Sequence, residues 1–110
     1  MGYALADAAI EAGAFVNLVS GPVSIKANKH VNLIKINSAK EMLDKVVKFM
    51  NDSDIFIGCA AVSDFRPSDY SDIKIKKEGM KNIDIQLEKN EDILGYVASE
   101  YPSAFVVGFA

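Results

Sequence analysis

One stretch of the chain, Ile55 to Val62 with the sequence IFIGCAAV, constrains the fold more than any other. It is an almost unbroken apolar run, and its second half is rich in small residues. Such a run is typical of a central strand in a parallel sheet, because both faces of that strand are covered and both must be apolar. We therefore expect a buried parallel strand here, with helices packed on its two faces.

Helix and strand patterns alternate before and after this run. Gly13 lies where a left-handed residue ends a helix, and Ser38 with Glu41 has the spacing of a capping box. The expected elements are a helix over 1–12, strands over 15–20 and 31–37, a helix from Ser38 to about Asp52, the strand over 55–62, a strand over 83–87, a helix capped by Asn90 and ending near Ser99, and a strand over 104–109. This order predicts an α/β, Rossmann-like three-layer fold with a mainly parallel sheet.

The two ends of this pattern look incomplete. No strand precedes the helix over 1–12, and the chain stops within the apolar segment over 104–110. A length of 110 residues fits a single domain. We expect residues 1–110 to be the central part of one domain that is truncated at both ends.

The composition argues against several classes of function. Twelve Lys and Arg against fifteen Asp and Glu give a net charge of -3, which disfavours broad binding to nucleic acid or to anionic membranes. The apolar runs are far shorter than the roughly 20 residues that span a bilayer, and no leader pattern opens the chain, so we expect a cytoplasmic protein. With Cys59 and His30 as the single residues of their kinds, the sequence predicts neither an intrachain disulfide nor a zinc site.

Candidate binding residues follow the strands, because ligands of open parallel sheets bind beyond the carboxyl ends of the strands. The segment Gly58 to Ala61 is small enough for a flat ring to lie against its backbone, although small residues more often allow a helix to pack closely. Asp64 has the chemistry to bind a ribose or Mg²⁺, and also that of a turn residue. Arg66 is suited to a phosphate or carboxylate, or to a local pair with Asp69 or Asp72.

Three lysines lie close together in SDIKIKKEG: Lys74, Lys76 and Lys77. Alternation of lysine and isoleucine is typical of an edge strand protected from aggregation. The same ammonium groups on a loop made flexible by Gly79 would form an anion clamp for a triphosphate. The pattern alone leaves both interpretations open and favours the edge strand.

Four segments in this order make the chain closely resemble the bacterial phosphopantothenate–cysteine ligase domain: MGYALADAAIEAGAFVNLVSGPV, AAVSDFRPSDYSDIKIKK, LEKNEDIL and FVVGFA. The most specific is A-A-V-x-D-[YF]-R-P, followed ten residues after its Asp by K-x-K-K. The resemblance covers essentially all 110 residues. That domain is commonly the carboxyl-terminal half of a bifunctional coenzyme A biosynthesis protein, fused to a flavin-dependent decarboxylase. FMN is implied only if the parent protein carries that half.

The resemblance implies a defined chemistry. CTP, with Mg²⁺, activates the carboxylate of 4'-phosphopantothenate as an acyl-cytidylate, and the amino group of cysteine then displaces CMP to form 4'-phosphopantothenoylcysteine. Lys74 would be needed to form the acyl-cytidylate, with Lys76 and Lys77 beside it on a flap. The residues that would contact the nucleotide are Gly58, Cys59, Ala60, Asp64, Lys74, Glu91, Asp92, Ile93, Leu94 and Phe109. The family also implies a homodimer of the full-length protein.

Departures from the family pattern bear on these expectations. Cys59 and Ser63 stand where Ala is usual, Phe65 where Tyr is common, and Glu91 where the family has Pro. The family's glycine-rich segment and catalytic Asn lie before Met1, so we expect weak or absent ligase turnover from this chain alone. Two other classes remain open: a non-catalytic nucleotide-binding domain, and an NAD-dependent oxidoreductase of the same fold.

Overall fold

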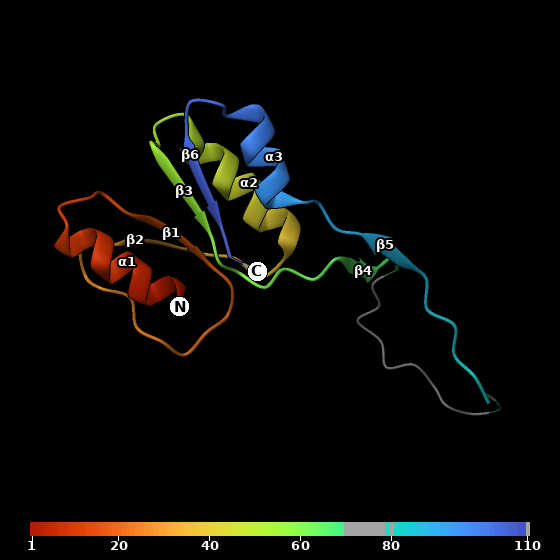
Figure 1. The fold of residues 1–110 in the computed structure, drawn as a ribbon. Helices are drawn as coiled ribbons and strands as arrows, with labels where there is room; N and C mark the ends of the chain where they lie inside the picture. The colour runs from red at the N-terminus through yellow and green to blue at the C-terminus, as the bar shows by residue number, and fades with distance from the viewer. Residues whose placement is uncertain (70–78, 80, 110) are drawn as a thin grey trace.

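The computed structural model describes residues 1–69, 79 and 81–109 of the chain. Helices and strands alternate along it (Figure 1). The elements are α1 (Gly2–Glu11), β1 (Asn17–Ser20), β2 (Asn32–Lys35), α2 (Ala39–Met50), β3 (Ile55–Gly58), β4 (Phe65–Pro67), β5 (Leu87–Lys89), α3 (Ile93–Glu100) and β6 (Phe105–Gly108). Among these described elements, no helix is both long and apolar enough to cross a membrane.

The strands beneath the helices pair in parallel. β1 pairs with β2, and β3 pairs with β6 so that Ile55 lies opposite Phe105 and Gly58 opposite Gly108. Because each pair joins strands separated by a longer connection, the pairing requires crossovers rather than hairpins. The parallel pairing predicted from the alternation of elements is confirmed.

Helices α2 and α3 cover one face of these strands and form the core with them. Val46 and Met50 of α2 meet Ile93 and Val97 of α3, and all four side chains are buried. Partly buried side chains from β1, β3 and β6 pack against this cluster: Val19, Phe56 and Val106. Val46 and Met50 are four positions apart, so both lie on the face of α2 that contacts α3 and the strands.

Helix α1 lies on the opposite side of the strands, which gives the three predicted layers (Figure 1). Its Ala6 is buried, and its first turn contacts the ends of β1 and β3. The backbone φ of Gly13 is +91°, so the left-handed end predicted for this helix is confirmed. Phe15, predicted to begin the next strand, is fully exposed, and β1 begins only at Asn17.

The prediction that the apolar run is covered on both faces is wrong. β3 ends at Gly58, and its alternate side chains Ile55 and Ile57 are 60% and 41% exposed, as is Phe105 of β6 at 69%. The core lies only on the side of Phe56, because α2 and α3 both pack there. In this chain one face of the run is therefore packed in the core, and the other face is an exposed apolar surface.

A two-stranded antiparallel arm, β4 with β5, extends away from the parallel strands (Figure 1). The sequence predicted a strand over 83–87, whereas the structure has β5 at Leu87–Lys89 and a partner, β4, that was not predicted. β4 ends at Pro67, which has no N–H to donate and lies at an edge where none is needed. The edge strand predicted around Lys74 lies outside the described residues.

Of the two N-cap residues predicted from the sequence, the one of α2 is confirmed and the one of α3 is wrong. Ser38 caps α2, accepting a hydrogen bond from the Glu41 N–H at 3.1 Å, while the Glu41 carboxylate accepts from the Asn37 N–H at 3.0 Å. At α3 the cap is Asp92, which accepts from the Gly95 N–H, rather than Asn90. Both side chains can serve as caps, but Asn90 is engaged with distant residues that local sequence does not reveal.

Candidate functional site

The carboxyl ends of β1 and β3 lie beside the first turn of α1. The Tyr3 hydroxyl donates to the Ser20 Oγ at 2.9 Å, directly at the end of β1. A Cβ atom placed on Gly2 would lie 3.0 Å from the Sγ of Cys59, the residue after β3. The two parallel strand pairs therefore share one carboxyl edge, which is the position where open parallel sheets bind ligands.

The start of α1 contributes favourable electrostatics to this edge. No side chain caps this helix, and its N-cap is Met1. The N–H groups in the first turn of a helix have no intrahelical partner, and the helix dipole is positive there. An anionic ligand at this edge would be stabilised by both effects.

Gly108, at the end of β6, allows α3 to approach the edge. The Gly58 C=O accepts a hydrogen bond from the Phe109 N–H at 3.0 Å, so the chain continues the β3–β6 pairing to Phe109. The Leu94 side chain lies over both strands, because a Cβ on Gly108 would overlap it and a Cβ on Gly58 would lie 3.5 Å from it. Close packing of α3 therefore requires a glycine at Gly108, whereas a Cβ on Gly58 would only be in ordinary contact with Leu94, and Ala60 beyond it stays exposed.

The segment that leaves β3 is joined to the start of α3. The backbone N–H of Asn90 donates to the Asp64 C=O at 2.7 Å, and the Asn90 side-chain amide donates to the Ser63 C=O at 2.8 Å. Asp64 and Asn90 are more than 25 positions apart in the sequence, yet they are hydrogen-bonded to each other here. Asn90 therefore brings together the 58–64 and 91–94 segments, which contain residues predicted to contact a nucleotide.

Arg66 has partners that the sequence did not indicate. Its guanidinium donates to the Glu88 carboxylate at 3.0 Å, and to the Lys89 C=O and Asn90 Oδ1 at 3.0 and 3.1 Å. The local pair proposed with Asp69 is not formed; the other candidate, Asp72, lies outside the described residues. The error arose because β4 and β5 pair across 19 intervening residues, a contact that only the folded chain reveals.

The remaining candidate residues differ in where their side chains lie. Ile93 is 8% exposed with its side chain in the core, so only its backbone faces the edge. The Asp92 carboxylate caps α3. Glu91 lines a cavity of about 360 Å³ together with Lys40, Asp44 and Arg66, two basic residues and a second acidic one. The three lysines of the K-x-K-K segment lie outside the described residues.

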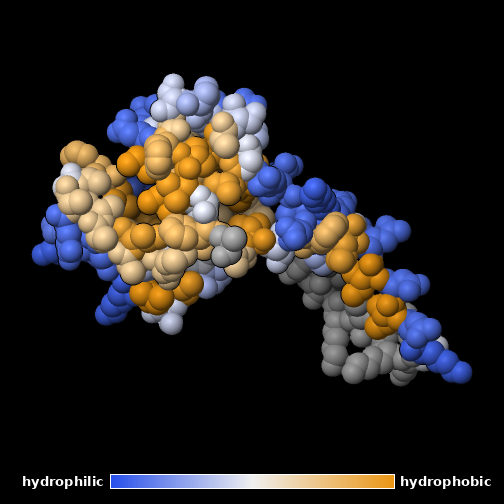
Figure 2. All heavy atoms as spheres, viewed as in Figure 1, coloured by the Kyte–Doolittle hydropathy of each residue, from blue (hydrophilic) through white to orange (hydrophobic). Residues whose placement is uncertain are grey.

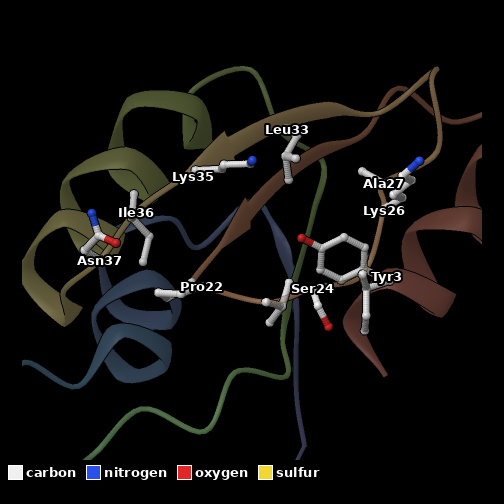
Figure 3. Close-up of a pocket in the computed structure, with 12 residues that line it drawn as sticks. Tyr3, Pro22, Ser24, Lys26, Ala27, Leu33, Lys35, Ile36 and Asn37 are labelled. Carbon is white, nitrogen blue, oxygen red and sulfur yellow. The ribbon is translucent and has the colours of Figure 1, made fainter.

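A larger cavity, of about 610 Å³, lies next to the same edge and was missed by the sequence reasoning. It is bounded by the loop after β1, the end of β2 and the first turn of α1; Figure 3 draws lining residues from each of these elements, among them Tyr3, Lys26 and Lys35. Val23 and Ile25 supply apolar lining. The cavity is thus lined by apolar and basic residues, and the loop opened by Gly21-Pro22 was the sequence signal for it.

Residues 1–110 match, over their whole length, a family described as the DNA/pantothenate metabolism flavoprotein C-terminal domain. The "Coenzyme A biosynthesis bifunctional protein CoaBC" of Vibrio vulnificus is 47% identical over 112 residues, and that of Escherichia coli (strain K12) is 42% identical over 113. Each alignment covers all of this chain and 28% of the relative, so the chain spans about 28% of the length of the curated relatives it matches.

A solved structure has the same fold. The crystal structure of the C-terminal domain of a "Coenzyme A biosynthesis bifunctional protein CoaBC" aligns with 99% of this chain and 50% of its own, with a TM-score of 0.83 and 34% identity. The Rossmann-like α/β class predicted from the alternation of elements is confirmed by this likeness.

Proposed function

Because the chain belongs to the DNA/pantothenate metabolism flavoprotein C-terminal domain family, we propose that residues 1–110 are the central part of the ligase domain of a CTP-dependent phosphopantothenate–cysteine ligase in coenzyme A biosynthesis. One observation carries the proposal beyond the family match. The 58–64 and 90–94 segments are far apart in sequence but are hydrogen-bonded to each other through Asn90 at the carboxyl edge. A nucleotide bound at that edge would contact both.

The proposed reaction has two steps. A carboxylate oxygen of 4'-phosphopantothenate attacks the α-phosphorus of CTP, the bond to the β-phosphate breaks, and pyrophosphate leaves with the acyl-cytidylate formed. The amino group of cysteine then attacks the acyl carbon, the bond to CMP breaks, and the amine loses a proton as the amide forms. Both steps need stabilisation of negative charge that develops on phosphate oxygens.

The residues of this chain would contribute binding and orientation. The Gly58 C=O is already bonded to the Phe109 N–H, so the backbone groups of Cys59 and of the exposed Ala60, just beyond β3, would pair with a cytosine edge that lies against Gly58. Asp64 and the first turn of α3, Glu91 to Leu94, would flank the ribose and phosphates, and Phe109 at the end of β6 would contact the same nucleotide. Lys74, Lys76 and Lys77 would neutralise the triphosphate.

Mg²⁺ fits this donor set as an ion that arrives with the nucleotide. The described residues contain no group of three or more His, Cys, Asp or Glu side chains that could hold a metal. Mg²⁺ in nucleotide sites is usually held by one or two carboxylates together with phosphate oxygens, and Asp64 would supply such a carboxylate. The ion would add charge neutralisation at the phosphates. FMN is proposed only for a decarboxylase half, outside these residues.

The test of the proposal is nucleotide-dependent ligation by the natural full-length polypeptide that contains these residues. With 4'-phosphopantothenate, cysteine and Mg²⁺, pyrophosphate release should be at least about tenfold faster with CTP than with ATP at subsaturating nucleotide, since a base edge is read by hydrogen bonds. Residues 1–110 alone should show weak or absent turnover. Equal rates with the two nucleotides would remove the CTP assignment, and no release with either would remove the ligase assignment.

We also propose that the full-length protein is a homodimer that uses the arm. Apolar side chains follow the arm and the segment leading into β5 (Figure 2): Phe65, Ile83, Ile85 and Leu87, all at least half exposed. Uncovered apolar side chains on a strand ribbon favour association with a second copy.

Replacing Leu87 with aspartate should shift the full-length protein from dimer to monomer, because the substitution places a charge on this apolar surface. Sedimentation velocity at one protein concentration would measure the change. Ile25→Asp is the matched control, since Ile25 is equally exposed but lies in the loop after β1. A Leu87→Asp protein that remains dimeric would show that the arm is not the interface.

A further inference from the structure

Asn90 makes three hydrogen bonds to residues that lie far from it in sequence. Its backbone N–H donates to the Asp64 C=O, and its side-chain NH₂ donates to the Ser63 C=O. Its side-chain oxygen accepts from the Arg66 guanidinium at 3.1 Å. All the hydrogen-bonding groups of the side chain are thus turned toward the segment that leaves β3, and none is used to cap α3.

Arg66 fixes the orientation of that side chain. A guanidinium donates only, so the Asn90 atom facing it must be the carbonyl oxygen, which directs the NH₂ group toward Ser63. The same planar group also binds the Lys89 C=O and the Glu88 carboxylate of β5. Because these donors are held in one plane, the guanidinium aligns the end of the arm with Asn90 in a single arrangement.

These bonds contribute little to global stability. The side chains of Arg66 and Glu88 are 49% and 52% exposed, and ion pairs at such exposure are weak in water. Asn90 is only partly buried. Their consequence is local: Asn90 lies two residues before the cap of α3, so its position sets where the helix begins relative to Asp64.

We infer that Asn90, oriented by Arg66, is a positioning residue that holds the two halves of the nucleotide site, residues 58–64 and 91–94, in register. The inference rests on the function proposed above. Asn90 need not touch the nucleotide. It acts by keeping the Asp64 segment and the first turn of α3 at a fixed separation.

The test compares Asn90→Ala with Asn32→Ala in the full-length polypeptide. Asn32 also uses its side-chain amide in an exposed hydrogen bond, to Asn17 at 2.8 Å, but this bond lies at the amino ends of β1 and β2, away from the edge. The measurements are the KM for each substrate, the unfolding temperature, and amide hydrogen exchange of residues 60–66 and 90–95. Arg66→Lys, which keeps the charge but loses the planar fork, is the second variant.

We expect Asn90→Ala to raise the KM for CTP about tenfold, because small displacements of positioning groups are costly. The KM values for 4'-phosphopantothenate and cysteine should stay within about twofold of wild type, as should all values for Asn32→Ala. Exchange should accelerate in both segments of Asn90→Ala but not in Asn32→Ala, and Arg66→Lys should change the same quantities as Asn90→Ala in the same direction. The unfolding temperatures should remain close to that of the wild type.

Two results would overturn the inference. An unchanged KM for CTP in Asn90→Ala is one, and a lower unfolding temperature with the KM values of all three substrates raised alike is the other, because that is the signature of a merely structural residue. If the wild-type protein shows no CTP-dependent ligation, the proposed function fails, and hydrogen exchange alone tests whether Asn90 holds the two segments together. Faster exchange of both segments in Asn90→Ala then supports this role of Asn90, and unchanged exchange excludes it.

Discussion

Replacing Lys74 with glutamine should lower the rate of acyl-cytidylate formation by the full-length protein by about 10²- to 10³-fold, the range found when a group that stabilises developing charge is removed. Glutamine retains much of the side-chain length but carries no charge to offset the departing pyrophosphate. Single-turnover release of pyrophosphate, measured with 4'-phosphopantothenate and CTP but without cysteine, isolates this step. The loss should persist at saturating CTP, because it affects the chemical step.

The control for this substitution is Lys29→Gln. Lys29 is an exposed lysine in the loop between β1 and β2, so the control removes the same charge from the protein at a position far in sequence from the K-x-K-K segment. Its pyrophosphate release should stay within about twofold of wild type, as for most surface substitutions. Undiminished acyl-cytidylate formation by Lys74→Gln would show that this lysine does not have the assigned role.

Replacing Ile93 with alanine should reduce the free energy of unfolding of the chain by about 2–5 kcal/mol, the range for truncating a buried isoleucine. Ile93 is 8% exposed and packs with Val46, Met50 and the fully buried Val97. Few other side chains in the described part of the chain are as buried, so the cavity removes a large share of a stability that is about 5–15 kcal/mol in ordinary domains. Urea denaturation followed by far-UV circular dichroism would measure the change.

The matched control is Ile25→Ala. Ile25 is 57% exposed in the loop after β1, so the same truncation should change the free energy of unfolding by less than about 0.5 kcal/mol. Equal losses in the two variants would mean that α3 does not pack on α2 in solution as it does in this structure. The comparison therefore tests the core that holds the first turn of α3 at the edge.

Much of the fold could be predicted because its signals are local. The capping box at Ser38, the left-handed Gly13 and the apolar spacing of α2 each involve residues within one or two helical turns. The parallel pairing of β3 with β6 followed from the alternation of strands with helices, since crossovers force parallel neighbours. The residue ranges of the strands were less accurate, as β3 ends four residues before the predicted end.

The sequence singled out residues of the candidate site, but it did not show which of them contact one another. Local sequence made Asn90 a helix cap and Arg66 the partner of a nearby aspartate. In the structure both residues bind partners more than 20 positions away, across β4 and β5. The cavity beside Tyr3 was missed for the same reason, because its walls come from three separate elements.

The sequence by itself determined the order and kind of the helices and main strands, the carboxyl edge where a ligand would bind, and the family to which the chain belongs. Hydrophobic period, capping residues and motif spacing are properties of neighbouring residues, so they can be recognised before folding. The tertiary structure decided which face of β3 is covered, where α3 begins, and how Asn90 joins the Asp64 segment to that helix. The covered face depends on where α2 and α3 pack, and the other two features depend on competition between local and distant hydrogen-bond partners; these distant contacts exist only once the chain has folded.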